Sequence, residues 1–535
     1  MASHQDGTAS DELYDVAIVG FGPSGAVAAG LLGGQGIRTF VCDKSHEVYD
    51  MPRAFALDHE IMRVFQQLGI AQEVLAFAEP FTPSEFYGVD GQLIKRFTTA
   101  PPPYPLGYVP SLVFTQPPVE RLLRARVRRL PSVDVALGCE FINLAQDADA
   151  ATLQLRAGDG SMRQVRARYA LACDGAASPV RRAVGIELRD LGFDQPWLVV
   201  DVLVNERGLA RLPQTSVQYC EPQRPCTYLI GPKNHRRWEI SINGGEDPAA
   251  LATPEETWKL LSRWLTPDEG TLWRQASYRF HALVAERWRV GRVFVAGDAA
   301  HQQPPFLGQG MCQGIRDACN LSWKLGAVLK GLAEGGLLDS YGVERKAHVT
   351  ELTTRIKAVG QLVGERDAGK ARERDARLLA ECDGVVKSVP RQDVQPPLAA
   401  GVLSPAREPG CGTIFPQPWL IPGAQAVLMD AVVGNGWRLV IDASAGELPA
   451  LARPALDALA LRVLRVGIAA GALPERDGVL AGWFKRHGCV AALVRPDHYV
   501  YGTAQRLNDI APLLESAASA GGYRFMAEPT AAFTA

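Results

Sequence analysis

Three glycines with a characteristic spacing lie near the start of the chain, in the run Gly20-Phe-Gly22-Pro-Ser-Gly25. Gly20 would permit a tight turn, Gly22 would let the backbone approach a pyrophosphate, and Gly25 would allow close helix–strand packing. The free N–H groups at the start of a helix bind anions, and Asp43 could accept hydrogen bonds from both ribose hydroxyls. The pattern predicts binding of a dinucleotide, either NAD or FAD. The alternative is a tight turn in some other α/β protein.

The elements that would position these residues form a β-α-β unit. Residues 16–19 are apolar and β-branched, as in a buried parallel strand, and residues 26–32 are small residues and leucines, as in a helix packed on a sheet. Residues 37–42 read as a second strand that ends at Asp43. Strand, turn, helix and acid therefore follow in the order of a Rossmann-like domain.

The rest of the chain predicts two further regions. Extended runs indicate a largely antiparallel sheet inserted into the nucleotide-binding domain; they lie at 140–155, 198–204, 216–219 and 237–242. A buried strand at 291–298, a helix at 314–329 and one or two long helices within 344–382 follow. A stretch rich in Pro and Gly then leads to a small α/β domain with strands at 437–441 and 490–494 and a helix at 454–464.

Composition excludes several classes of function. The length of 535 residues argues for about three domains, and a net charge of −2 offers no global positive field for nucleic acid or an anionic membrane. The ten cysteines form no CxxC pair, so we expect free thiols in a reducing cytoplasm, and we find no metal-binding motif. The first residues do not resemble a secretory signal, and uncharged stretches at 16–37 and 411–429 are too rich in Gly or Pro to span a membrane.

Two downstream motifs distinguish FAD from NAD by resemblance. The run Ala172-Cys-Asp174-Gly175-Ala-Ala-Ser-Pro-Val-Arg181 resembles the DG motif of flavoprotein monooxygenases, and the run Gly297-Asp298-Ala-Ala-His-Gln-Gln-Pro-Pro-Phe-Leu-Gly308-Gln-Gly310 resembles their GD motif. With the glycine turn, these motifs identify residues 14 to 390 as similar to the class A flavoprotein aromatic hydroxylases, the superfamily of phenol and p-hydroxybenzoate hydroxylases. Residues 51–60, 116–123 and 236–239 resemble its 3-(3-hydroxyphenyl)propionate hydroxylase branch.

This resemblance implies a fold and a domain organisation. We expect a discontinuous Rossmann-like FAD-binding domain at 14–190 and 280–390, an antiparallel substrate-binding sheet at 191–279 and a linker at 391–412. Residues 413–535 resemble the thioredoxin-like tail of phenol hydroxylases. Because the tail lacks CxxC, we assign it no redox role, and a scaffold or subunit contact is the expected use.

The resemblance also assigns residues to the cofactor. FAD would contact the glycine turn, the second-strand acid, the DG and GD motifs, an arginine and a glutamine: Gly20, Gly22, Pro23, Ser24, Gly25, Asp43, Lys44, Arg53, Gln116, Asp174, Gly297, Asp298, Pro305, Gly308, Gln309, Gly310 and Met311. Asp298 would bind the ribityl chain, and the loop after it would line the flavin ring. Asp174 and Arg181 would stabilise FAD through the DG turn and help to admit NAD(P)H.

Two residues are candidates for catalysis. Asp58 could accept the phenol proton, with a helix-terminal acid beside Glu60 as the alternative. Arg237 could meet a substrate carboxylate or the phenolate, with a plain surface ion pair to Glu239 as the alternative. Further candidates for substrate contact are His59, Tyr219, Tyr228, Trp238, Glu239 and Pro304, although aromatic strand residues more often belong to the core.

The implied reaction is FAD-dependent hydroxylation of an aromatic ring. NADH or NADPH reduces the flavin, O₂ adds at its C4a atom, and the hydroperoxide hydroxylates a phenol at the ortho position. The branch implies a 3-hydroxyphenylpropionate-like substrate in aromatic catabolism. A hydroxylase of polycyclic antibiotic precursors and a non-catalytic FAD-binding protein are the alternatives, and a homodimer remains open beside a monomer.

Overall fold

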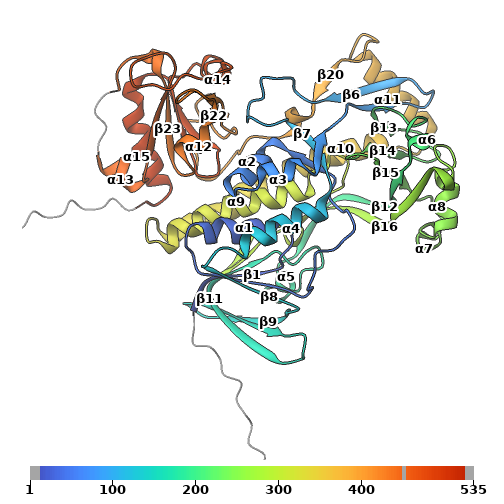
Figure 1. Ribbon diagram of the computed structural model, residues 1–535, viewed down its shortest axis with the longest axis horizontal. Coiled ribbons are helices and arrows are strands. Elements are labelled where there is room, and N and C mark those ends of the chain that lie inside the picture. The colour runs from blue at the N-terminus through green and yellow to red at the C-terminus, as the bar shows by residue number, and fades with distance from the viewer. Residues whose placement is uncertain (1–12, 449–452, 524–535) are drawn as a thin grey trace, which may run out of the picture. The chain divides into compact units, whose positions relative to one another are not determined.

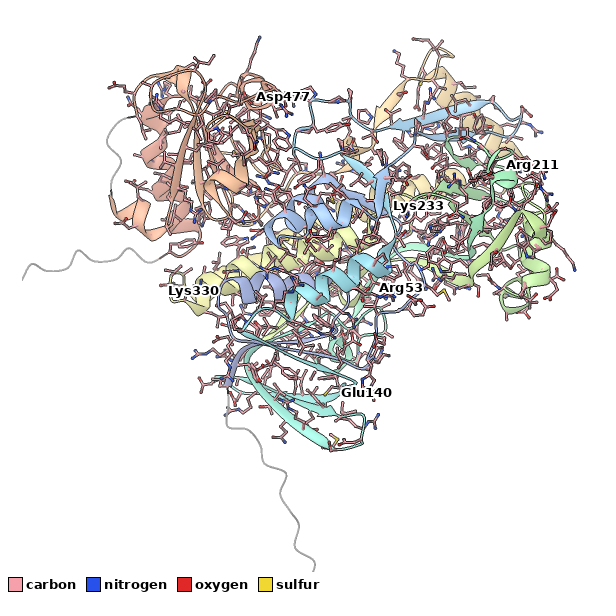
Figure 2. All side chains as sticks on the ribbon, in the orientation of Figure 1. Arg53, Glu140, Arg211, Lys233, Lys330 and Asp477 are labelled. Atoms are coloured by element: carbon pink, nitrogen blue, oxygen red, sulfur yellow. The ribbon has the colours of Figure 1, made fainter. Side chains whose placement is uncertain are left out.

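The computed structural model describes residues 13–448 and 453–523 (Figure 1). The chain forms two compact units: residues 13–101, 109–318 and 349–395 make the first, and residues 102–108, 319–348 and 396–523 make the second. Side chains fill the interiors of both (Figure 2). The expectation of no secretory signal concerns residues 1–12, and the predicted last domain includes 524–535; both segments lie outside the described residues.

The first unit contains an eight-stranded sheet with a parallel centre. Its strands run in the order β17-β18-β11-β1-β2-β8, and β10 and β9 extend it beside β11. The pairs β18–β11, β11–β1, β1–β2 and β2–β8 are parallel. The bounds are β1 Leu13–Val19, β2 Thr39–Asp43, β8 Val133–Leu137, β9 Glu140–Gln146, β10 Ala151–Arg156, β11 Met162–Ala172, β17 Arg289–Val290 and β18 Val293–Val295. The predicted Rossmann-like arrangement is confirmed.

Helix α1 (Pro23–Gly34) connects β1 to β2 and is buried along most of its length. Its composition explains this burial, because small residues let it approach its neighbours closely and no charged side chain needs water. A Cβ atom on Gly33 would lie 2.4 Å from a Val133 side-chain carbon, and one on Gly30 would lie 2.8 Å from Leu68. The glycines therefore set the spacing between this helix and its surroundings.

A second, nine-stranded sheet in the first unit is mainly antiparallel and has the order β19-β16-β12-β15-β14-β13-β5-β6-β20. Two of its pairs, β13–β5 and β20–β6, are parallel. The bounds are β5 Ser84–Tyr87, β6 Leu93–Thr98, β12 Leu188–Val204, β13 Ser216–Tyr219, β14 Cys226–Ile230, β15 His235–Ser241, β16 Gly270–Ala285, β19 His301–Gln302 and β20 Ser388–Pro390. The sheet thus includes four strands from outside 191–279: β5, β6, β19 and β20. The assignment of 191–279 as a separate substrate-binding domain stays a prediction.

The two faces of this sheet bury different sets of side chains. Val200 and Trp238 belong to a core covered by helices α7 (Pro248–Leu251) and α8 (Pro254–Leu261). Val199 and Trp197 lie in a core that includes residues of α10 (Asp339–Val363) and α11 (Ala368–Ala380). Alternation along each strand therefore separates residues that are neighbours in sequence.

Smaller elements complete the first unit. A three-stranded sheet has the order β3-β7-β4, and three helices, α2, α3 and α4, lie in the same part of the chain. The bounds are β3 Ala56–Asp58, β4 Ala78–Pro80, β7 Ser111–Phe114, α2 His59–Gln67, α3 Ala71–Leu75, α4 Gln116–Val127, α5 Pro179–Ala183, α6 Glu206–Leu209 and, shared with the second unit, α9 Gly310–Leu329.

The second unit contains a four-stranded sheet with the order β24-β23-β25-β26. Strand β23 is parallel to β24 and antiparallel to β25, and β25 is antiparallel to β26. This order, with helices after β23, β24 and β26, is that of the predicted thioredoxin-like α/β fold. The bounds are β21 Trp419–Leu420, β22 Val427–Leu428, α12 Met429–Val433, β23 Arg438–Asp442, α13 Arg453–Ala458, β24 Arg462–Val466, α14 Val479–His487, β25 Ala491–Val494, β26 Val500–Ala504 and α15 Ile510–Ala520.

One predicted element of this domain was partly wrong. The helix expected at 454–464 ends at Ala458, and β24 begins at Arg462. Ala460 has a positive φ of 46°, which a continuing helix does not permit, and Leu464 and Val466 are then buried on one side of a strand. The strand pairing with β23 overrides the local helical pattern.

A buried ion network lies in the second unit. Arg495 bonds to Glu344 at 2.7 and 3.1 Å and to Asp497 at 2.7 and 3.0 Å, while Lys324 Nζ lies 2.8 Å from Glu344. Asn320 also donates to Glu344 at 2.7 Å. Although burial opposes the charge of Glu344, Arg495 and Lys324 lower its pKa to about 2.

This network predicts a specific loss of stability. E344Q should lower the free energy of unfolding by about 3–5 kcal/mol, because it leaves two buried cations with one carboxylate fewer. The stabilisation from Glu344 should be complete above its ordinary pKa of 4.5 and fade as the pH falls toward 2. Urea titration at several pH values measures both effects. R506Q is the control: it breaks an exposed pair with Asp509 and should cost less than about 1 kcal/mol. Equal effects of the two variants would contradict the prediction.

Candidate active site

The glycine turn after β1 has the geometry that a dinucleotide requires. Gly20 has a φ of +100°, and a Cβ atom there would lie 2.3 Å from the backbone oxygen of Cys173. A Cβ atom on Gly25 would lie 2.0 Å from the Gly20 oxygen, so both positions exclude side chains. Gly22 meets no protein atom within 4 Å, which leaves the N-terminus of α1 open. The open turn and the free helix N–H groups fit a pyrophosphate.

Asp43 lies at the end of β2, beside this turn. One of its carboxylate oxygens accepts a hydrogen bond from the Phe21 backbone N–H at 2.8 Å, and the other accepts one from Ser45 N–H at 2.8 Å. Arg124 lies 3.8 Å away, and the neighbouring Lys44 is exposed. The carboxylate is thus held in place where a ribose beside the pyrophosphate would lie, and it keeps acceptor capacity for hydroxyl groups.

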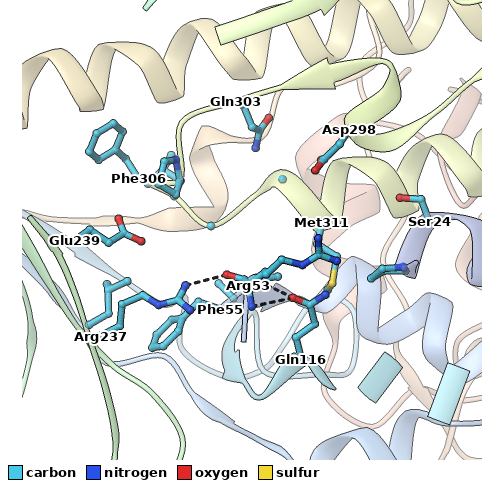
Figure 3. Close-up of a pocket in the computed structure, with 18 of the residues that line it drawn as sticks. Ser24, Arg53, Phe55, Gln116, Arg237, Glu239, Asp298, Gln303, Phe306 and Met311 are labelled. Carbon is cyan, nitrogen blue, oxygen red and sulfur yellow. Dashed lines mark hydrogen bonds between the residues drawn. The ribbon is translucent and has the colours of Figure 1, made fainter. Parts of the chain in front are cut away.

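A cavity of about 330 Å³ opens from this turn toward the second sheet (Figure 3). Gly22 follows β1, Cys173 follows β11 and Ala296 follows β18, so the cavity lies at the carboxyl ends of the parallel strands, where this fold binds ligands. The cavity brings together many of the residues predicted from the sequence: Gly22, Pro23, Ser24, Arg53, Gln116, Arg237, Glu239, Asp298, Pro305, Gly308, Gly310 and Met311.

The loop around Arg53 is fixed from one side by Gln116. The Gln116 side-chain oxygen accepts hydrogen bonds from the backbone N–H groups of Ala54 at 2.6 Å and Arg53 at 3.2 Å, and its amide donates to Glu120 at 3.2 Å. Gln116 starts α4, so a rigid helix holds the loop. The Arg53 side chain then extends along the cavity between Gln116 and Met311 (Figure 3).

Arg237 fixes the same loop from the opposite side. Its guanidinium donates to the backbone oxygens of Arg53 at 2.9 Å and Pro52 at 3.1 Å. It is also paired with Asp201 at 2.7 and 3.0 Å, and His235 shares that carboxylate at 2.7 Å. Burial opposes ionisation of Asp201, but Arg237 and His235 hold its pKa below the usual value. The ion pair is therefore buried, not at the surface, and most Arg237 donors are occupied before any substrate arrives.

Asp58 does not line the cavity. It is the N-cap of α2, where its carboxylate accepts hydrogen bonds from the N–H groups of Glu60 at 3.1 Å and Ile61 at 3.2 Å, and it is paired with Arg316. Arg316 in turn donates to the side-chain oxygen of Gln309 at 3.1 Å. The geometry favours the helix-terminal interpretation, with the correction that the carboxylate is buried. Through Arg316, the Asp58 carboxylate helps to hold the end of the loop at Gln309.

The aromatic candidates on the second sheet point away from the cavity. Tyr228 and Trp238 are fully buried in the core under α8, and Tyr219 packs against that core. The reason is alternation: Arg237 and Glu239 face the cavity, so Trp238 between them must face the other side. For these three residues the core alternative holds, and the prediction that they are cavity walls was wrong; of the strand candidates, Arg237 and Glu239 reach the cavity.

Other predicted residues lie beside the cavity. The Asp174 carboxylate accepts a hydrogen bond from Val180 N–H at 3.0 Å, and Arg181 donates to the Ala299 oxygen at 3.1 Å, which joins the two motif turns. His59 is buried, and burial lowers its pKa to about 4. The predicted residues that do not line the cavity are Gly20, Gly25, Asp43, Lys44, Asp58, His59, Asp174, Tyr219, Tyr228, Trp238, Gly297, Pro304 and Gln309.

Several cavity residues escaped the sequence reasoning. They are Phe55, Phe81, Gln218, Thr227, Leu229, Gln303 and Arg391, whereas Phe306 falls in the loop that was expected to line the flavin ring. Alternation was a usable signal for Gln218, Thr227 and Leu229, because their partners in the β13–β14–β15 register lie on the same face as Glu239. Arg391 had no such signal, since it falls at the start of the predicted linker.

A glycine turn for a dinucleotide, a cavity at the ends of the parallel strands and an inserted antiparallel sheet define a flavin-binding protein. The chain belongs to the family described as the FAD binding domain, which matches residues 13–356. Residues 412–517 match the HcaD C-terminal domain. The family predicted from the sequence is confirmed.

Curated relatives narrow the class further. A probable NADH-specific resorcinol 4-hydroxylase of Rhodococcus jostii is 35% identical, with 96% of each chain covered. A 3-(3-hydroxy-phenyl)propionate/3-hydroxycinnamic acid hydroxylase of Burkholderia cenocepacia is 33% identical over 91% of this chain and 93% of its own. The flavin-dependent monooxygenase PieE has the same fold, with a TM-score of 0.79 and 23% identity over 96% of this chain and all of its own. The protein is a FAD-dependent aromatic hydroxylase that uses NAD(P)H and O₂.

In residues 13–448 and 453–523, no helix is both long and apolar enough to cross a membrane. Within the same ranges, His, Cys, Asp and Glu side chains form no group of three or more that could hold a metal ion.

The open space at Gly22 predicts a variant that folds but loses its cofactor. Gly22→Ala should leave the thermal midpoint unchanged, because its φ of −71° suits alanine and no protein atom lies within 4 Å of the new Cβ atom. FAD binding should weaken by about tenfold or more, or about 1.4 kcal/mol, because the methyl group takes the space of the pyrophosphate. Flavin fluorescence titration of the apoprotein measures this change. Gly34→Ala, also free of contacts, should bind FAD normally. Equal FAD affinity of G22A and the wild type would place the pyrophosphate elsewhere.

Proposed function

We propose that the protein hydroxylates a single-ring phenol with a short acidic tail, at the position ortho to its hydroxyl group. 3-(3-Hydroxyphenyl)propionate is the model substrate and NADH the reductant. One atom of O₂ enters the ring and the other leaves as water, while NADH and one proton supply the two electrons and the hydrogen. When bound, FAD supplies the transfer of electrons to O₂ and of oxygen to the ring.

The position of Arg391 is the observation that supports an acidic tail on the substrate. Arg391 lines the cavity, donates to the Leu307 oxygen at 2.8 Å and stacks over the Phe81 ring at 4.2 Å. Within residues 13–448 and 453–523, no carboxylate lies at ion-pair distance from it, and burial lowers its pKa to about 10. An unpaired cation in such a site is costly, and a substrate carboxylate would neutralise it.

The aromatic side chains in the cavity walls favour a substrate with a single aromatic ring. Phe55 and Phe81 belong to one apolar cluster, and Phe306 packs edge-on against Trp197 at 5.4 Å from the other side. Such rings shield the reaction from water. The relatives at 33–35% identity are named for resorcinol or for 3-(3-hydroxyphenyl)propionate and 3-hydroxycinnamic acid. Of these compounds, the two acids carry a carboxylate that could pair with Arg391 in the cavity. Resorcinol, which has no carboxylate, is the competing substrate.

The proposal also assigns the contacts of the cofactor. Gly20, Gly22 and Gly25 would hold the pyrophosphate of FAD, and Asp43 would hold its ribose. Asp298 would hold the ribityl chain, and residues 304–310 would line the flavin ring. Pro23, Ser24, Lys44, Arg53, Gln116, Asp174, Gly297 and Gln309 complete this assignment. NADH is favoured over NADPH by the name of the first relative.

Arg391 provides the test. The wild-type holoenzyme should consume NADH faster with 3-(3-hydroxyphenyl)propionate and form a catechol in step. R391Q should raise KM for this acid at least about tenfold, because a hydrogen bond to a charged group contributes about 1.5–3 kcal/mol, and should leave turnover of resorcinol little changed. Product analysis and steady-state kinetics measure these quantities.

R279Q is the matched control, because Arg279 lies on β16 in an exposed pair with Asp194 and does not line the cavity. It should behave as the wild type. If the wild type converts resorcinol but not the acid, or if R391Q changes both substrates equally, the acidic-tail proposal fails.

A further inference from the structure

Glu239 is a buried acid that the fold itself does not use. It lies on β15, faces the cavity and is 3% exposed. Among the described residues no group donates a hydrogen bond to either of its carboxylate oxygens, and Oε2 is fully enclosed. A buried carboxylate without partners destabilises the folded protein, and an apolar side chain of similar size would avoid that cost. Such a group at a cavity wall is a candidate for function.

The neighbouring arginine does not serve Glu239 as a counter-ion. Arg237 lies two residues away on the same face, but its guanidinium is paired with the Asp201 carboxylate at 2.7 and 3.0 Å. Opposite Glu239 in the sheet stand Val199 on β12 and Thr227 on β14, and the Thr227 hydroxyl donates to Gln218 at 2.6 Å. The flanking strands therefore offer no basic group for Glu239, and its carboxylate remains available to a ligand.

The charges around Glu239 tune it for proton exchange near neutral pH. Burial raises its pKa to about 7; Arg237 opposes this shift and Asp201 adds to it. The other charged residues that line the cavity are Arg53, Arg391 and Asp298. A proton acceptor works best when its pKa lies close to the working pH.

We infer that Glu239 is the catalytic residue that accepts the proton of the phenol hydroxyl, an inference that rests on the proposed hydroxylation of a phenol. The O–H bond breaks, the proton moves to a Glu239 oxygen, and the electron pair stays on the phenolate oxygen. The phenolate is then electron-rich at its ortho carbon, where oxygen enters. The ring then loses its C–H proton to water and becomes aromatic again, and Glu239 returns its own proton to the ring oxygen, so it is ready for the next turnover.

The test is E239Q, which keeps the size of the side chain and removes its basicity. Hydroxylated product per NADH consumed should rise with pH around 7 in the wild type. E239Q should lose that pH dependence and form product about 100-fold more slowly, as expected for loss of a general base. A polyfluorinated derivative of the same phenol that keeps one ortho C–H, assayed at a pH above the pKa of its own hydroxyl group, should restore product formation in E239Q. This rescue also shows that the variant is folded and holds FAD.

Two controls separate the outcomes. E239D keeps a carboxylate and should retain the pH dependence with a lower rate. D194N removes an exposed carboxylate from the same sheet, outside the cavity, and should match the wild type. If the wild type hydroxylates the phenol and E239Q does so with an equal rate and pH profile, or if the ionised phenol gives no rescue, Glu239 is not the acceptor. If the wild type hydroxylates neither 3-(3-hydroxyphenyl)propionate nor resorcinol, the proposed function fails first.

Discussion

The buried pair between Arg237 and Asp201 is the interaction on which the rest of the site depends. It joins two strands of the second sheet, and the arginine continues from there to the backbone oxygens of the loop that carries Arg53. Breaking a buried ion pair is costly, so this contact fixes sheet and loop in one arrangement. Because Asp201 satisfies the arginine, the acid two residues along the strand is left without a counter-ion. Structural rigidity and chemical availability at Glu239 thus have a common origin.

The cavity also shows how one sheet serves two purposes. One face packs as an ordinary apolar core around Trp238, and the other presents polar groups such as Thr227 and Glu239 to the ligand space. The strict alternation of strands allows both without compromise, because each polar residue is followed by one that strengthens the core. Binding residues on such strands are held by the sheet hydrogen bonds, which gives the rigid support that catalysis requires.

The nucleotide-binding turn and the fold class could be predicted because their causes are local. Gly20 has a left-handed φ of +100° in the turn, a side chain at Gly25 would meet the Gly20 oxygen, and strand, turn and helix follow directly in the chain. The partners of buried charges could not be predicted in this way. Asp58 meets Arg316, which is remote in sequence, and Arg391 reaches the cavity from a stretch that reads as a linker. Local patterns identify which residues are unusual, but tertiary packing decides whether they support the structure or meet a ligand.

The set of residues that makes up the second unit has a practical consequence for the design of shortened versions of the protein. Residues 319–348 cluster with 396–523, and Glu344 is ion-paired with both Lys324 and Arg495. A fragment that stops in the Pro- and Gly-rich stretch before residue 412 would retain Glu344 and Lys324 but lose the guanidinium that pairs with Glu344 in the interior. The tail is therefore no detachable accessory, and recombinant shortening at that joint would remove part of the interior of the remaining piece.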